Sequence, residues 1–105
     1  MAEIVWTESA LSELNDIAEY IALDKTRAAI KLVQRVFNRV DLLSDSPKSG
    51  RKPPELGDSR YREVIVGPCR IFYRVDNDKV VILYVMRSER LLRNYILEER
   101  GKNDN

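Results

Sequence analysis

The sequence predicts an α+β fold in which an N-terminal strand and an αα-hairpin pack on a mainly antiparallel sheet, followed by a short C-terminal helix. Two consecutive segments with helical spacing of apolar residues fill the first half of the chain. A loop rich in proline and glycine follows, and then three runs rich in β-branched and aromatic residues. The order of elements is therefore β-α-α-β-β-β. With 105 residues we expect one domain over 1–105, of which 97–105 is polar and forms a frayed tail.

The first strand and the first helix open the chain. Residues 3–6 read Glu-Ile-Val-Trp, a short β-branched and aromatic run typical of a strand. Thr7 is then a suitable N-cap, and the acidic Glu8 falls in the first turn, where the helix dipole favours it. Apolar residues three and four apart predict the helix that follows. They are Ala10, Leu11, Leu14, Ile17, Ala18, Ile21 and Ala22.

A second helix is predicted after a break at residues 24–26, Asp-Lys-Thr, which can cap it. Residues 44–47, Ser-Asp-Ser-Pro, end it. Lys31, Arg35 and Arg39 lie four apart on the side that we expect to face water. So short a link between the helices predicts an antiparallel αα-hairpin. The apolar positions of the second helix are Ala29, Leu32, Val33, Val36, Phe37, Val40 and Leu43.

Residues 47–59 form a loop, because they hold three of the four prolines and two of the four glycines. Short turns at Gly67-Pro68 and at 76–78 join the strands after it into a meander. The last strand is apolar on both faces, so we expect it to be central. The hairpin would cover one face of the sheet, and the C-terminal helix would partly cover the other. The three strands are predicted at 60–66, 69–76 and 79–87, and the helix contains Leu91, Leu92, Tyr95 and Ile96.

Composition excludes several classes of site. Histidine is absent, and Cys69 is the only cysteine. The chain therefore has no Ser-His-Asp triad, no Cys-His pair, no His-ligated zinc and no internal disulfide. It has no phosphate-binding glycine motif, so we expect no cofactor and no metal. No apolar stretch approaches the roughly 18 residues of a membrane span, and the N-terminus lacks a signal-peptide core, so we expect a cytoplasmic protein without a membrane partner.

Positive charge concentrates in the middle of the chain. Residues 47–75 hold seven Lys and Arg against three Asp and Glu, a balance of +4, while residues 1–46 hold five against eight. Strand alternation places Arg70, Phe72 and Arg74 on the less apolar face of their strand. We interpret these three residues as a cationic platform with a stacking surface. The alternative is a set of edge-strand charges that discourage aggregation.

The most specific motifs lie between residues 50 and 92. Six pieces follow one another in a defined order: Gly50-Arg51, Pro54-Glu55-Leu56, Arg62-Glu63, Gly67-Pro68, Arg70-Ile71-Phe72-Tyr73-Arg74 and Arg90-Leu91-Leu92. Over roughly Ile4 to Ile96, this pattern resembles the RelE/ParE family of toxins from type II toxin–antitoxin systems. It is closer to the ParE-like members.

The resemblance implies a toxin that binds DNA gyrase and is neutralised by a cognate antitoxin in a hetero-oligomer. Such a protein needs no catalytic group, which favours a binding protein over an enzyme. The residues expected to bind the target are Arg62, Arg70, Phe72, Arg74, Arg87 and Arg90. The residues expected to bind the antitoxin are Leu14, Ile21, Arg60, Arg62 and Arg74.

Two alternatives stay open. The first is a RelE-like, ribosome-dependent mRNA endonuclease, whose catalytic cluster the resemblance would place at Arg70, Arg87, Arg90 and Tyr95. Lys52 is the nearest counterpart of the lysines in that site. The second is a non-toxic remnant that only binds its antitoxin. The chain also departs from the family where many ParE-like members carry His-Gly, because Arg87 and Ser88 stand there.

Overall fold

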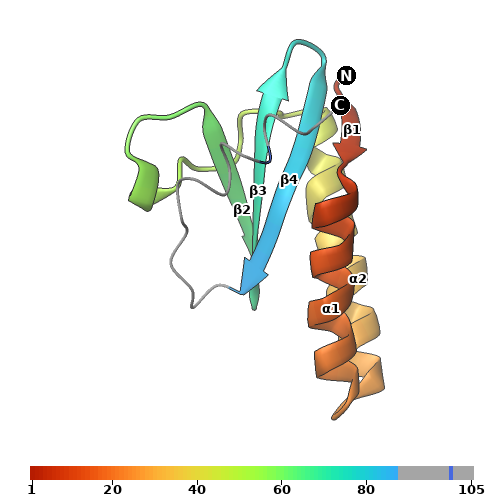
Figure 1. Cartoon of the computed structure of the whole chain (residues 1–105). Coiled ribbons are helices and arrows are strands. Elements are labelled where there is room, and N and C mark those ends of the chain that lie inside the picture. The colour runs from red at the N-terminus through yellow and green to blue at the C-terminus, as the bar shows by residue number, and fades with distance from the viewer. Residues whose placement is uncertain (88–99, 101–105) are drawn as a thin grey trace.

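The computed structural model describes residues 1–87 and Arg100, and it confirms the predicted α+β class (Figure 1). Each predicted helix and strand before residue 88 is present within one or two residues of its expected bounds. The predicted C-terminal helix, with Leu91, Leu92, Tyr95 and Ile96, lies outside the described residues. The elements are β1 Glu3–Trp6, α1 Glu8–Ala22, α2 Thr26–Asp41, β2 Tyr61–Val66, β3 Cys69–Asp76 and β4 Lys79–Arg87, with 3₁₀ turns η1 Leu42–Ser44 and η2 Pro54–Leu56.

The four strands form one mixed sheet in the order β1-β4-β3-β2. The meander β2-β3-β4 is antiparallel, and β1 pairs parallel to β4. The prediction that the last strand is central is therefore confirmed. The β1 pairing covers only the first half of β4, from Lys79 to Ile82.

Thr7 explains how the first helix starts where it does. Its side chain accepts a hydrogen bond from the Ala10 amide at 3.2 Å, which caps α1 as predicted. The same hydroxyl donates to the Ile82 carbonyl at 2.8 Å and so attaches the start of the helix to β4. The second cap differs from expectation, because Lys25 occupies the N-cap of α2 without a side-chain hydrogen bond.

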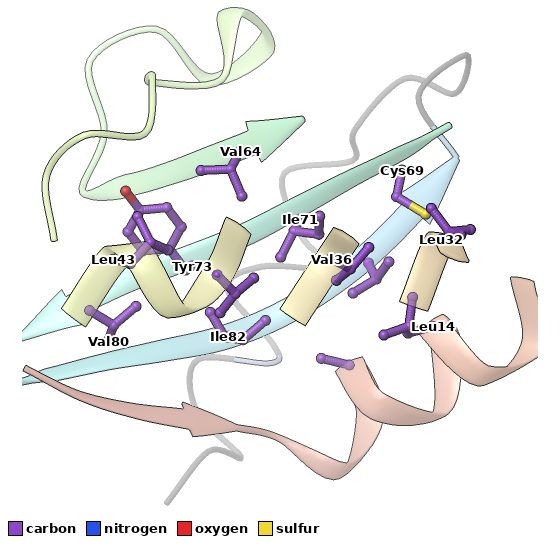
Figure 2. Close-up of a cluster of buried hydrophobic side chains, with 13 residues drawn as sticks. Leu14, Leu32, Val36, Leu43, Val64, Cys69, Ile71, Tyr73, Val80 and Ile82 are labelled. Atoms are coloured by element: carbon purple, nitrogen blue, oxygen red, sulfur yellow. The ribbon is translucent and has the colours of Figure 1, made fainter. Parts of the chain in front are cut away.

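The main core lies between the helical hairpin and one face of the sheet (Figure 2). Leu14, Leu32 and Val36 of the hairpin meet Ile71 and Ile82 of the sheet. A second, smaller cluster of buried side chains lies on the other face of the sheet. It consists of Tyr61, Phe72, Val81, Leu83 and Met86, all buried. Both faces of β3 and β4 therefore carry buried side chains. Among residues 1–87 and 100, no helix combines the length and the apolar character that crossing a membrane requires.

Candidate functional site

Arg70 lies on the face of β3 that points away from the helices, and its guanidinium is held by two carboxylates. Its Nε donates to Glu63 Oε1 at 2.7 Å. Its Nη1 and Nη2 donate to the two carboxylate oxygens of Glu55 at 2.7 and 2.8 Å, a bidentate pair. These hydrogen bonds, first to Glu55 and then to Glu63, raise the pKa of Arg70 further above its usual value. Arg70 is 5% exposed, so this is a buried ion cluster.

Glu63 joins this cluster to the loop before β2. Its side chain is fully buried, and Oε2 also accepts from Arg51 Nε at 2.9 Å. The backbones of Arg51 and Glu63 exchange two hydrogen bonds of 3.0 and 2.8 Å, which form an isolated antiparallel bridge on the outer edge of β2. The loop therefore folds back on the sheet and brings Glu55 of η2 over β3. We call Arg51, Glu55, Glu63 and Arg70 the ion cluster.

The expectation of an exposed cationic platform is wrong. The alternation was correct, since Arg70, Phe72 and Arg74 do share a face. But Phe72 is 0% and Arg74 8% exposed, and Arg74 donates to Asp76 at 2.6 Å. Arg70 lies 5.0 Å from the Phe72 ring centroid, and Tyr84 packs on the same ring. The carboxylates that neutralise these arginines are Glu55 of the loop, Glu63 of β2 and Asp76 at the end of β3. The return of the loop that brings Glu55 to Arg70 is not visible in strand alternation.

The other predicted target residues do not join Arg70 on one surface. Arg62 lies on the opposite face, beside Tyr73, and donates to the Gly50 carbonyl at 2.9 Å. Arg87 ends β4 next to α1, 5.8 Å from the Tyr20 ring centroid. Ser88, Arg90 and Tyr95 lie outside the described residues, so the RelE-like cluster is described only at Arg70 and Arg87. Lys52 is exposed and pairs with Asp58.

The predicted antitoxin contacts are mixed in their exposure. Leu14, one of the expected antitoxin contacts, is 3% exposed and packs in the main core, so it offers almost no surface to a partner. Ile21 is half-buried against that core, and Arg60 is exposed with its guanidinium 5.2 Å from the Tyr61 ring centroid. Other apolar residues of the hairpin face water. They are Leu11, Tyr20, Leu23 and Ile30.

Surface grooves adjoin the helices. An apolar groove of about 340 Å³ runs between α1 and α2 on the outside of the hairpin, with Ala18, Ala22 and Ile30 among its lining residues. A more polar groove of about 590 Å³ lies between α1 and the half of β4 that β1 leaves open. There Glu13 accepts from the Val85 amide at 3.1 Å and from Arg100 at 2.7 Å. Within the described part of the chain, no cluster of three His, Cys, Asp or Glu residues could hold a metal ion.

Tyr73 fixes the start of the loop. Its hydroxyl donates to the Pro47 carbonyl at 2.8 Å and accepts from the Gly50 amide at 2.9 Å. A Cβ at residue 50 would lie 2.5 Å from that hydroxyl and 2.7 Å from the Glu63 carbonyl, so glycine is required there. Burial raises the pKa of Tyr73, and its hydrogen bond with Gly50 and the positive charges of Arg62 and Arg39 oppose the rise.

Tyr73→Phe is expected to lower the free energy of unfolding by about 1–3 kcal/mol, because the Gly50 amide and the Pro47 carbonyl lose their partner inside the protein. A second effect concerns pH. Because the pKa of Tyr73 is raised in the folded state, the native chain retains a proton that the unfolded chain loses above the ordinary value of 10.0. Wild-type stability should therefore fall as pH rises above 10.0, and less steeply in Tyr73→Phe. Urea titrations at a series of pH values measure the free energy of unfolding of both proteins. If it fell equally steeply with pH above 10.0 in wild type and in Tyr73→Phe, the prediction would be contradicted.

Residues 4–92 match the family model described as the ParE toxin of the type II toxin–antitoxin system parDE. The chain belongs to the ParE toxin family. It is thus a toxin of a type II toxin–antitoxin system, and the predicted RelE/ParE resemblance is confirmed.

Individual relatives agree with the family. The chain is 39% identical over 85 residues to the putative toxin Y4kP of Sinorhizobium fredii, covering 81% of this chain and 86% of the relative. It is 35% identical over 92 residues to Toxin RelE2 of Caulobacter vibrioides, covering 87% of this chain and 100% of the relative. Among solved structures, a chain of the chromosomal ParDE TA system from P. aeruginosa is similar with a TM-score of 0.70 at 25% identity, over 85% of this chain and 98% of that one.

Proposed function

We propose that this ParE-family toxin inhibits growth by binding DNA gyrase, and that a cognate antitoxin neutralises it by covering its surface. The observation that carries the choice of binding over catalysis is the ion cluster. Cleavage of RNA requires a cation that is available to stabilise charge on the phosphorus in the transition state. The guanidinium of Arg70 is already bound by Glu55 and Glu63 in a buried setting.

The ribosome-dependent nuclease is therefore the less supported alternative. In that function Arg70 would need to release two carboxylates before it could meet a phosphate. Arg87 is half-buried against Tyr20 and lies on the helix side of the sheet, away from Arg70. The chain also lacks histidine, so a general base would have to come from a carboxylate, a lysine or a tyrosine.

For the antitoxin we infer an amphipathic segment that docks on the hairpin. The apolar groove between α1 and α2 offers Ile30, which is 54% exposed, beside small alanines that allow close approach. An antitoxin helix whose apolar face packs into this groove would bury apolar surface that is exposed to solvent in the toxin alone. Ile21 and Arg60 then remain as predicted contacts, whereas Leu14 can contribute only from within the core.

Supercoiling of relaxed plasmid by purified gyrase is the direct test. Added in molar excess, the toxin is expected to reduce supercoiling or to trap cleaved DNA, and co-purified antitoxin is expected to restore activity. Heat-denatured toxin is the control for non-specific effects. Normal supercoiling at every toxin concentration would remove gyrase as the target. New codon-positioned mRNA ends on induction in cells would then favour the nuclease.

A further inference from the structure

A row of positive side chains follows the side of α2 that lies next to β2. Lys31, Arg35 and Arg39 are four residues apart, so each lies about 6 Å along the helix from the next. Arg62 of β2 extends the row, because it lies on the helix-facing side of the sheet. We call Lys31, Arg35, Arg39 and Arg62 the α2 stripe. Lys31 and Arg35 are exposed, and Arg39 and Arg62 are half-buried.

The α2 stripe differs from Arg51, Arg70 and Arg74 in that its cations have no carboxylate partner among the described residues. Arg51, Arg70 and Arg74 are each paired with Glu or Asp. Within residues 1–87 and 100, none of the four stripe cations lies in an ion pair. Most acidic residues of the hairpin are on α1, where Glu13 and Asp16 line the groove beside β4. Asp41, the last residue of α2, forms no ion pair with a stripe cation among the described residues. The positive charge of the stripe is therefore not neutralised locally.

Two of the guanidiniums are held in place by backbone carbonyls. Arg35 donates to the Gly67 carbonyl at 3.1 Å, and Arg62 to the Gly50 carbonyl at 2.9 Å. Each uses one nitrogen in that bond, and a guanidinium has five N–H donors, so donors remain for a ligand. The stripe is thus partly preorganised before any ligand arrives.

We propose that the α2 stripe binds the phosphodiester backbone of a nucleic acid. Polypeptide interfaces usually have an apolar centre, but the exposed residues that separate the stripe cations on α2 are polar, Gln34 and Asn38. Arginine matches the geometry of phosphate oxygens, and amide side chains also bind phosphates. The apolar residues that suit a polypeptide lie elsewhere, in the groove between α1 and α2. This inference goes beyond gyrase binding and does not depend on it.

Fluorescence anisotropy with labelled duplex DNA and labelled single-stranded RNA tests the proposal, with poly-glutamate as an acidic polypeptide competitor. For three to four phosphate contacts on duplex DNA, affinity should fall about 40- to 150-fold between about 50 and 200 mM salt. Binding of either probe supports the stripe as a phosphodiester site, and the tighter probe identifies DNA or RNA as the source.

Matched variants distinguish the stripe from general charge. Arg35→Gln with Arg39→Gln removes two stripe cations and should weaken binding about tenfold or more at low salt, with a shallower salt slope. Lys25→Gln with Lys79→Gln removes the same charge from exposed sites off the stripe and should change binding less than twofold. Lys31 is exposed, and the single variant Lys31→Gln should reduce the steepness of log affinity against log salt concentration by about one.

Three results would overturn the proposal. They are no binding of either nucleic acid, equal losses in the two double variants, and tighter binding of poly-glutamate than of both nucleic acids. The last would identify an acidic polypeptide as the ligand. Circular dichroism checks that each variant is folded. If the double variant Arg35→Gln with Arg39→Gln does not fold, the salt dependence of binding by Lys31→Gln decides the question.

Discussion

Replacing Arg70 by alanine is expected to lower the free energy of unfolding by about 3–5 kcal/mol, which is a large part of the stability of a domain of this size. The reason is the charge that remains. Without Arg70, the fully buried carboxylate of Glu63 keeps one ion-pair partner among residues 1–87 and 100, which is Arg51, and the Arg51 side chain is 54% exposed. Glu55 of η2 also loses its bidentate partner, so the loop loses one of its attachments to β3.

Urea unfolding followed by far-UV circular dichroism measures this effect. Arg35→Ala is the matched control, because Arg35 is exposed and donates a hydrogen bond to the carbonyl of Gly67 in a turn. It should change stability by about 0.5 kcal/mol or less. A loss below about 1 kcal/mol for Arg70→Ala would show that the buried carboxylates are well solvated in solution.

A double variant separates the charge from the packing. Arg70→Met with Glu63→Leu removes the buried charges together and fills similar volumes with apolar atoms. Apolar replacement of a buried ion pair is often close to neutral in stability. We therefore expect the double variant to recover most of the loss seen in Arg70→Ala. If it did not, the loop would depend on the charges themselves rather than on burial.

Much of the fold could be predicted because its signals are local. Helical spacing and the Thr7 cap defined α1, and the apolar run through β4 identified a strand buried on both faces. The alternation in β3 placed Arg70 and Phe72 on one face correctly. Each of these inferences depends on neighbours a few residues apart, where the backbone geometry repeats.

The exposure of the arginines could not be predicted in the same way. It depends on Glu55 returning to Arg70 and on Arg51 bridging to Glu63, and no periodic pattern links a loop to the strand that it covers. The register shift in β3–β4 is also invisible to alternation: Phe72 pairs with Tyr84 but Tyr73 with Ile82, so Leu83 is the extra residue of a bulge. The motifs Pro54-Glu55-Leu56 and Arg62-Glu63 place two carboxylates before Arg70, but their spacing does not show that both meet its guanidinium.

The structure places the unpaired positive charge on other residues than the sequence predicted, and this changes which residues are worth testing for function. Sequence reasoning placed the cationic surface on β3, where the structure has neutral ion pairs. Unpaired cations of the described residues instead gather on α2 and on the helix-facing side of β2. Loss of toxicity in Arg70→Ala would thus reflect unfolding, whereas loss in Arg35→Gln with Arg39→Gln would report on a surface. Of the predicted target residues that the structure describes, Arg62 belongs to this surface.

Ile82→Ala is expected to lower the free energy of unfolding by about 2–5 kcal/mol. Ile82 is 0% exposed and lies where three elements meet. It pairs with Trp6 of β1, it sits opposite Tyr73 of β3, and its carbonyl accepts from the amide and hydroxyl of Thr7 at the start of α1. Removal of its side chain leaves a cavity in a region whose backbone is fixed on both sides, so the surroundings have little freedom to collapse.

Ile65→Ala provides a control with the same chemical change. Ile65 is on β2 and is 49% exposed, so the same truncation should cost about 1 kcal/mol or less. Both residues are in strands, so the loss of β-propensity is similar in the two variants. The difference between their losses in free energy of unfolding therefore reports the effect of burial. Equal losses would mean that the β1–β4 junction is loosely packed, and the placement of Ile82 in the main core would be wrong. Thermal unfolding of the two proteins at one concentration is sufficient to decide.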